Sequence, residues 1–305
     1  MIANIHAYFS STGGSYEIFM SRFPRDAVGF IPLYAKKLPE NTALRVYAIG
    51  GDGILFDCLN GIIGLKNTEL GIIPYGITNS FISGFGKNAK DIFRNIETQC
   101  KAAPIPLDVI RCGNNYSLNS CIFGIEAEAI RHAEWLRKKK KKSGFLYKWF
   151  LKKFYNVYYY FGVLTAHIRK KNFQYHYEIN IDGETFEGPC LGAAVFNGAY
   201  YSNNLHPVKN AMPNDGILDI LITCGYIRLR FFGVIFNYIK GRPHKFPKIF
   251  TKKEGRTVKI KSENPIVYNM DNIPFFDNLL EIEILPNAVQ FIDATGYGYK
   301  GVSND

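Results

Sequence analysis

Three glycines and one aspartate follow an apolar run in the first part of the chain. The run covers residues 46–49, and the loop after it reads Gly50-Gly51-Asp52-Gly53. Because glycine has no Cβ, the backbone N–H groups of such a loop can close around an anion. Residues 54–59 are compatible with the start of a helix, whose free N–H groups and positive dipole end favour a phosphate group. The pattern predicts a strand that leads into a phosphate-binding loop, and an ordinary tight turn is the alternative.

A second unit of the same kind follows along the chain. Residues 70–73 form an apolar run, and Pro74 and Gly76 then indicate a turn. Residues 78–80 are Thr, Asn and Ser, which commonly cap helices. Two strand–turn–helix units in succession favour one nucleotide-binding crevice over an isolated turn.

The elements that must position these loops alternate in the first third of the chain. Apolar runs at 5–9, 44–49, 70–73 and 105–109 are separated by helix-compatible stretches. This alternation is typical of a parallel sheet covered by helices. The sequence therefore predicts an α/β domain, with the N-terminal residues as its first strand.

The rest of the chain shows strands separated by hairpin signals. Residues 113–115 separate two β-rich runs, and Asp182-Gly183 separates two more. We interpret Asp182-Gly183-Glu184 as a type I′ turn and not as a cluster of catalytic carboxylates. Further strands are predicted at residues 190–196, 218–223, 257–261, 265–269, 280–285 and 288–291. A largely antiparallel second domain follows from this pattern.

Composition bounds the class of protein. The 305 residues are 47% hydrophobic and 15% aromatic, which is enough apolar material for one large or two ordinary domains with a core. The formal net charge of +11 suits an anionic partner such as nucleic acid, a membrane surface or nucleotide phosphates. The six cysteines form no CxxC pair and have no histidine at zinc spacing, so we expect reduced, buried thiols.

The sequence contains no recognisable targeting or membrane-spanning segment. The N-terminus lacks a basic leader and a cleavage site. No uncharged apolar run reaches the roughly 18 residues that a membrane span needs. We therefore expect a cytoplasmic protein.

One segment interleaves positive charge with large aromatic residues. It contains Arg137, Lys138, Lys139, Lys140, Lys141 and Lys142, and aromatic residues recur through positions 145–155. Such a segment suits an anionic lipid surface, where cations meet the headgroups and aromatic rings lie at the interface. A solvated loop before an ordinary core helix is the second interpretation. Nucleic-acid contact is the third, and we do not favour it because no helix-turn-helix, zinc-finger or RNP motif is present.

Both glycine-containing loops resemble the phosphate-binding motifs of the diacylglycerol kinase catalytic family, which includes bacterial lipid kinases, ceramide kinases and sphingosine kinases. The resemblance extends over nearly the whole chain. Residues 106–109 and 116–119 resemble the family's crossing into its second domain, and residues 124–128 resemble its Gly-Phe-Asp-Ala-Glu stretch. The most specific match is residues 196–201 followed by residues 211–219, which resembles a family signature with a turn of the type Asp-Asp-Gly-Leu-Leu-Asp before a strand.

This resemblance implies an α/β N-terminal domain of the NAD kinase/diacylglycerol kinase type, followed by a mainly antiparallel β-sandwich that helps bind lipid. The implied boundaries are residues 1–108 and 109–285, with a C-terminal segment from about 286 to 305 that returns to the first domain. The implied activity is transfer of the γ-phosphate of ATP, with Mg²⁺, to the hydroxyl of a membrane lipid such as diacylglycerol or a sphingoid base.

The family motifs also imply roles for particular residues. The residues implied to bind the nucleotide are Thr12, Gly13, Gly50, Gly51, Asp52, Gly53, Gly76, Thr78 and Asn79. Asp52 would face the acceptor hydroxyl or a Mg²⁺-bound water. Glu128 matches a lipid-headgroup position of sphingosine kinases, with a solvated face as the alternative. Asp215 and the carbonyl of Ile217 match a structural Mg²⁺ site of some bacterial members, with an ordinary turn as the alternative.

Four family positions differ in this chain. The Asn-Pro-x-Ser-Gly motif loses its asparagine and proline at residues 9–14, Ile54 replaces a threonine, and Ser80 replaces an aspartate. Ile273 occupies the position of the glutamate proposed as the family's general base, and isoleucine cannot accept a proton. Asp271, two positions earlier and expected on the same strand face, is then a candidate base. Asp52 is the other candidate.

Three functions stay open at this point. The leading one is an ATP-dependent lipid kinase that associates peripherally with a membrane, and a homodimer is one open oligomeric state. The second is a relative of that family that binds nucleotide or lipid with weak or no transfer, which Ile54 and Ile273 favour. The third is an NAD kinase, whose Ser/Thr-Pro-Thr-Gly-Ser loop has no counterpart here.

Overall fold

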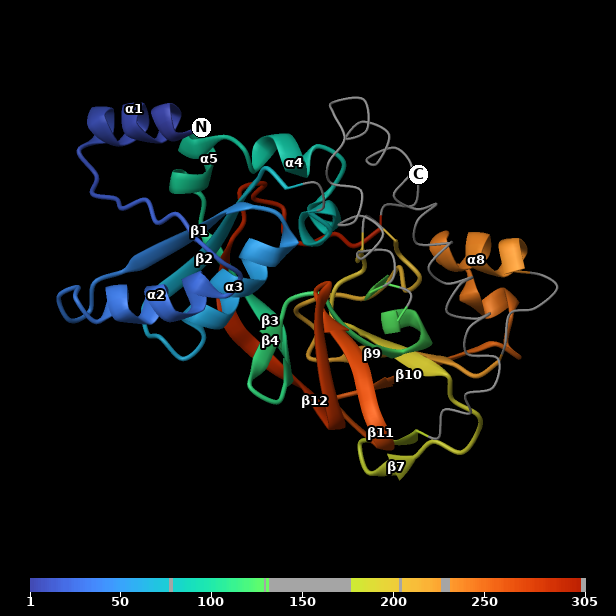
Figure 1. Cartoon of the computed structure of the whole chain (residues 1–305). Helices are drawn as coiled ribbons and strands as arrows, with labels where there is room; N and C mark the ends of the chain where they lie inside the picture. Colours follow the sequence, from blue (N-terminus) through green and yellow to red (C-terminus); the bar gives the residue numbers. More distant parts are fainter. Residues whose placement is uncertain (77–78, 129, 132–176, 203–204, 226–230, 303–305) are drawn as a thin grey trace, which may run out of the picture.

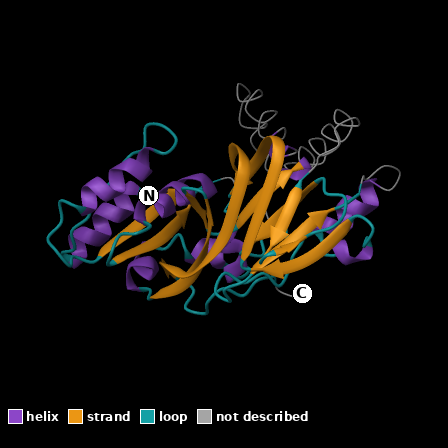
Figure 2. Ribbon diagram, turned by 90° about the horizontal axis from the view of Figure 1, so that it is seen from below, coloured by secondary structure: helices purple, strands orange, loops and turns teal. Residues whose placement is uncertain are grey.

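A single mixed sheet runs through the protein. The computed structural model describes the chain except residues 77–78, 129, 132–176, 203–204, 226–230 and 303–305. Within the described part, the 12-stranded sheet has the main order β1-β2-β12-β11-β5-β8-β9-β10, and β3, β4, β6 and β7 pair off this path. Figure 2 shows its strands continuing from the helix-rich half into the β-rich half.

Parallel strands covered by helices form the first half. β1 (Leu44–Gly50) and β2 (Thr68–Pro74) pair in parallel, and β2 also pairs in parallel with the end of β12 (Ile273–Ile292). Helix α2 (Asp26–Ala35) packs on α3 (Asp52–Ile62), which lies against β1 and β2 (Figure 1). On the other face of β1, Tyr47 donates a hydrogen bond to a carbonyl of α5 (Ile96–Lys101). The prediction of an α/β unit is confirmed.

The N-terminal residues form a helix, so the strand predicted at residues 5–9 is wrong. Helix α1 (Ile2–Thr12) ends where Gly13 adopts a left-handed conformation with φ 73°. Ile2, Ile5 and Phe9 recur at intervals of three and four residues, which fits a helix as well as a short apolar strand. Only Ile5 of this helix is buried.

Antiparallel strands form the second half, as predicted. They are β3 (Pro104–Cys112), β4 (Asn115–Ser117), β5 (Ser120–Gly124), β6 (Glu178–Ile181), β7 (Glu184–Thr185), β8 (Gly192–Phe196), β9 (Leu218–Thr223), β10 (Phe250–Gly255), β11 (Thr257–Met270) and β12. The strands predicted separately at 257–261 and 265–269 are both parts of β11, which shifts register against β12 between Lys261 and Ile266. A second register shift, between Leu285 and Val289, lies in β12. The remaining elements are α4 (Ala89–Ile92), α8 (Phe231–Ile239) and the 3₁₀ helices η1 (Phe81–Phe85) and η2 (Pro243–Lys245).

Two local predictions are confirmed. Asp182 and Gly183 have φ values of 50° and 92°, which a type I′ hairpin turn requires. The Asp182 carboxylate accepts hydrogen bonds from the N–H groups of Arg256 and Thr257, so it ties the turn to β11. All six cysteines are free thiols, and each is buried or half-buried.

The two halves have separate hydrophobic cores that share strands. Phe81 and Phe85 of η1 pack on Phe291 of β12 in the α/β half, and the inward-facing residues of β5, β9 and β11 form the second core. The predicted domain boundaries at residues 108 and 285 fall inside the continuous strands β3 and β12. These boundaries therefore stay predictions. No helix in the described part of the chain has both the length and the apolar character that crossing a membrane requires.

Candidate active site

The loop between β1 and α3 requires glycine at its first position. Gly50 has φ 157°, and a Cβ on it would lie 2.6 Å from the Ile54 side chain. Gly51 then caps α3 in an extended conformation, and Asp52 is the first helical residue. The N–H groups at the start of α3 therefore lie directly beside the loop, as the sequence predicts for a phosphate site.

The two predicted loops lie together. The carbonyl of Gly50 accepts hydrogen bonds from the N–H groups of Tyr75 (2.9 Å) and Gly76 (2.8 Å). Because β1 and β2 are parallel neighbours, their carboxyl ends meet at one edge of the sheet. The predicted crevice therefore has its backbone framework at this edge.

Asp52 is buried and held by the second loop. The residue is only 7% exposed, and its two carboxylate oxygens accept the backbone N–H of Ser80 (2.9 Å) and the Ser80 hydroxyl (3.2 Å). Ser80 stands at one of the positions that depart from the family motif. The structure shows that this serine is the partner of Asp52, a role that sequence reasoning missed because it compared Ser80 only with the aspartate it replaces.

Asp271 is held in a turn, which corrects its predicted place on a strand. β11 ends at Met270 and β12 begins at Ile273, so Asp271 and Asn272 form the hairpin turn, with φ values of 46° and 70°. Asp271 and Ile273 therefore do not share one strand face. Asn and Asp tolerate the left-handed region better than other residues do, which allows the turn.

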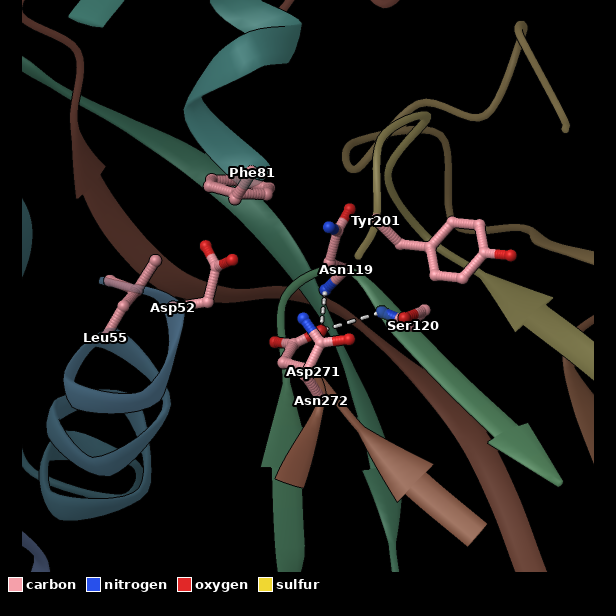
Figure 3. Close-up of a pocket in the computed structure, with 8 residues that line it drawn as sticks. All are labelled: Asp52, Leu55, Phe81, Asn119, Ser120, Tyr201, Asp271 and Asn272. Atoms are coloured by element: carbon pink, nitrogen blue, oxygen red, sulfur yellow. Dashed lines mark hydrogen bonds between the residues drawn. The ribbon is translucent and has the colours of Figure 1, made fainter. Parts of the chain in front are cut away.

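Three backbone N–H groups hold the Asp271 carboxylate. Asn119 (3.2 Å) and Ser120 (2.9 Å) donate to Oδ1 (Figure 3), and Leu118 (2.9 Å) donates to Oδ2. Burial raises the pKa of this carboxyl to about 7, and the negative charge of Asp52 contributes in the same direction. The three N–H groups oppose this rise because they stabilise the ionised form.

Asp52 and Asp271 line one pocket at the junction of the two halves. This small pocket is lined by Asp52, Leu55, Phe81, Asn119, Ser120, Tyr201, Asp271 and Asn272. Figure 3 shows Asp52 at the start of α3, Asp271 on the hairpin turn opposite, and Asn119 and Tyr201 on the side of the β-rich half. Asn119 and Tyr201 both lie in segments that resemble the family, although neither was singled out as a site residue.

Ile273 lies against the phosphate loop. A Cβ added to Gly53 would be 3.8 Å from the Ile273 Cδ1 atom. The position where the family has its proposed base is thus beside the loop, but here it presents a methyl group. A proton from an acceptor hydroxyl must go to another group.

The other residues predicted to bind the nucleotide do not all lie at the Gly50 loop. Thr12 and Gly13 are exposed at the end of α1, which packs on α5, and the Thr12 hydroxyl donates to the carbonyl of Tyr8 (3.0 Å). The structure does not bring this pair to the Gly50 loop, because the segment before it is helical. Thr78 lies outside the described residues. The Asn79 amide donates to the carbonyl of Gly76 (2.9 Å), and its buried Oδ1 has no hydrogen-bond partner among the described residues.

The predicted lipid and metal positions lie outside this pocket. Glu128 is buried and forms an ion pair with Arg131 (2.8 Å). Asp215 accepts the N–H of Ile217 (3.0 Å), and burial, followed by the charges of Asp219 and Asp108, raises its pKa. Among the described residues no three His, Cys, Asp or Glu side chains are grouped to hold a metal. The predicted membrane segment at residues 137–142 lies outside the described residues.

An α/β half that carries a glycine loop, joined to an antiparallel β half, defines the NAD kinase-like and diacylglycerol kinase-like class of phosphotransferases. Family models match both halves: the diacylglycerol kinase catalytic domain at residues 1–112 and the YegS C-terminal NAD kinase beta sandwich-like domain at residues 120–293. The chain therefore belongs to the diacylglycerol kinase catalytic-domain family. This membership implies a kinase that uses ATP as the phosphoryl donor.

Individual relatives agree with this assignment. A probable lipid kinase YegS-like from Shewanella frigidimarina (strain NCIMB 400) is 24% identical over 284 residues, which cover 92% of this chain and 85% of that protein. A putative lipid kinase of Staphylococcus aureus (strain JH9) is 21% identical and covers 81% of this chain and 76% of its own length. The structure of a putative diacylglycerol kinase from Bacillus anthracis str. Sterne superposes with a TM-score of 0.64 at 21% identity, covering 90% of this chain and 85% of that one. This likeness confirms the fold.

Proposed function

We propose that the protein transfers the γ-phosphate of ATP to the hydroxyl of a membrane lipid such as diacylglycerol or a sphingoid base, with Mg²⁺ as cofactor. The observation that carries this proposal is the pocket lined both by Asp52, beside the glycine loop, and by Asp271 on the hairpin turn. Phosphoryl transfer depends mainly on positioning and charge neutralisation, and both can come from a loop, a helix N-terminus and two carboxylates.

We assign Asp52 as a ligand of the Mg²⁺ ion. Mg²⁺ prefers oxygen donors, and a buried carboxylate next to the phosphate loop fits that preference. When bound, the ion would neutralise charge on the phosphate oxygens. Ser80 holds the Asp52 carboxylate in one orientation through two hydrogen bonds. The loop from Gly50 to Gly53 would hold the phosphates through its N–H groups and those at the start of α3.

Asp271 is our candidate for the general base. A carboxylate oxygen can accept more than one hydrogen bond, and Oδ2 of Asp271 accepts only one from the described backbone, from Leu118. The turn holds the side chain at the pocket wall, and a pKa of about 7 matches a base that works near neutral pH. Asp271 thus takes over the proton that Ile273 cannot accept.

Transfer of ³²P from ATP to a panel of diacylglycerol, sphingosine, ceramide and undecaprenol in mixed micelles tests the proposal. We expect transfer to one lipid class with the wild type, and at least a hundredfold less with Asp52→Ala. Glu97→Gln is the matched control, because Glu97 is an exposed carboxylate on α5. Binding of ATP without transfer to any lipid would instead favour a catalytically inactive relative, for which the apolar Ile273 beside Gly53 is the specific observation.

We also propose peripheral association with anionic membranes through Arg137 and Lys138 to Lys142. The support is the composition of this segment, in which six consecutive cationic side chains precede an aromatic-rich stretch. Sedimentation with vesicles measures it: the wild type is expected to bind phosphatidylglycerol-containing vesicles more tightly than pure phosphatidylcholine ones. Replacing the five lysines by glutamine should remove that difference, and an unchanged preference would contradict the proposal.

A further inference from the structure

Tyr75 is an exposed aromatic residue at the carboxyl end of β2. It is 53% exposed, although β2 itself is buried from Leu70 to Pro74. Its backbone N–H donates to the carbonyl of Gly50 (2.9 Å), so its main chain is fixed to the phosphate loop. The fold thus holds a large ring at the edge of the sheet where ligands bind in α/β proteins.

Arg94 holds this ring from one side. Its guanidinium carbon lies 5.3 Å from the centroid of the Tyr75 ring, and its Nε donates to the carbonyl of Pro74 (2.9 Å). The Asp91 carboxylate pairs with its Nη1 atom at 3.4 Å. Because a cation covers one face while more than half of Tyr75 stays exposed, the exposed surface is largely the opposite face and the edge. A fixed ring with an open face is suited to stacking on another flat ring.

A buried acceptor without a partner lies in the same loop. Asn79 is 6% exposed, and its Oδ1 atom accepts no hydrogen bond from the described residues. An acceptor needs a donor, and the ionised phosphates of ATP have none. The nucleoside part of ATP has donors at the ribose hydroxyls and at the adenine amino group. The second loop therefore offers a flat surface and an acceptor, which together match a nucleoside.

We propose that Tyr75 is the stacking partner of the adenine base of ATP and that Arg94 is the positioning residue that orients the Tyr75 ring. This subsite rests on the proposed function, because it assumes that the phosphates bind at the Gly50 loop beside it. Every purine has a face that can stack, so we expect the Tyr75 ring to discriminate only weakly between ATP and GTP in binding.

Direct binding measurements test this assignment without the lipid reaction. Tyr75→Ala should weaken ATP binding by about fivefold or more, since stacking of one base on an aromatic ring has that magnitude. Tyr75→Phe should bind ATP like the wild type. Inorganic tripolyphosphate has no base, so its affinity should be equal in all three proteins. Isothermal titration calorimetry with each ligand supplies these affinities.

Tyr297→Ala is the matched control. Tyr297 is 76% exposed and also has a cation over its ring, because Lys300 Nζ lies 4.6 Å from the centroid. It follows β12, which is one strand further from the Gly50 loop than β2. This variant should bind ATP normally, which separates base stacking from a general effect of removing an exposed tyrosine.

Two results would overturn the assignment of Tyr75 alone. One is a wild type that binds ATP together with a Tyr75→Ala variant of equal affinity. The other is an equal loss of tripolyphosphate binding in Tyr75→Ala, which would show that the loop had collapsed. A wild type that binds tripolyphosphate but not ATP would overturn the ATP-dependent function as well, so the two failures can be told apart.

Discussion

Ser80 donates both its backbone N–H and its side-chain hydroxyl to the carboxylate of Asp52, at 2.9 and 3.2 Å. The resemblance to the family places an aspartate at this position, where a second carboxylate would face Asp52 with like charge. A neutral serine removes that repulsion and supplies a donor instead. In this chain the second loop therefore orients Asp52 directly.

Removal of the Ser80 hydroxyl should lower both activity and stability. Ser80→Ala keeps the backbone donor and loses one hydrogen bond to a buried carboxylate, which costs about 1–3 kcal/mol of unfolding free energy. We expect about a tenfold lower kcat, because Asp52 would lose its fixed orientation. Ser11→Ala is the control, since the exposed Ser11 hydroxyl bonds only to a helix carbonyl of α1. A Ser80→Ala variant with wild-type kcat would show that this contact does not orient Asp52 for catalysis.

Ile273→Glu should raise the rate of transfer. The Ile273 side chain already lies at the phosphate loop, as its 3.8 Å distance to a Cβ on Gly53 shows. A carboxylate there would supply a second base near the acceptor hydroxyl, and a positioned general base contributes on the order of a hundredfold or more. Ile273→Gln has nearly the same shape as the glutamate variant but cannot take up a proton. Equal kcat values for the two variants would rule out a gain through base catalysis.

The strong periodic segments of the sequence were sufficient to predict most of the fold. The loop at Gly50, the helix after it and the turn at Asp182-Gly183 were predicted because glycine position and strand alternation have few structural solutions. The prediction of an N-terminal strand was wrong because Ile2, Ile5 and Phe9 satisfy both a helical and an extended pattern. Only packing decides between those two, and packing depends on distant residues.

The site was predictable in its residues but not in its contacts. Asp52 and Asp271 were both chosen from motifs, and the structure brings them to one pocket. Asp52 is held by the N–H and the hydroxyl of Ser80, and Asp271 by N–H groups of the segment 118–120. Backbone donors leave no signature in residue type. The turn at Asp271-Asn272 was also missed, because alternation alone suggested that the strand continued through it.

The raised pKa of Asp271 should make stability fall as pH rises. The folded-state pKa of about 7 lies above the ordinary value of 3.8. Between these two pH values the folded protein therefore binds more protons than the unfolded chain does. The cost of ionising this half-buried group grows through that window, is complete above about pH 7, and is on the order of a few kcal/mol. Urea unfolding of wild type and Asp271→Asn between pH 5 and 8 measures it. We expect the unfolding free energy of the wild type to fall relative to that of Asp271→Asn as pH rises, and a constant difference would contradict a titrating Asp271.

The C-terminal segment should be sensitive to a single added methyl group. Tyr299 packs on η1, where a Cβ on Gly84 would lie 2.1 Å from the tyrosine Cζ atom, and Lys300 donates its N–H to the Gly84 carbonyl (2.7 Å). The Tyr299 hydroxyl also accepts the N–H of Ala199 (2.8 Å) in the β-rich half, so this one ring contacts both halves.

Gly84→Ala should therefore cost roughly 1–3 kcal/mol or more, because the buried ring has no room to move aside. Gly29→Ala is the matched control: Gly29 lies within α2, and a Cβ there meets no atom within 4 Å. Alanine at that helical position should stabilise the protein by about 0.5–1 kcal/mol. Thermal unfolding of both variants measures these opposite shifts in Tm. A Gly84→Ala variant with wild-type Tm would show that Tyr299 does not pack on η1 in solution.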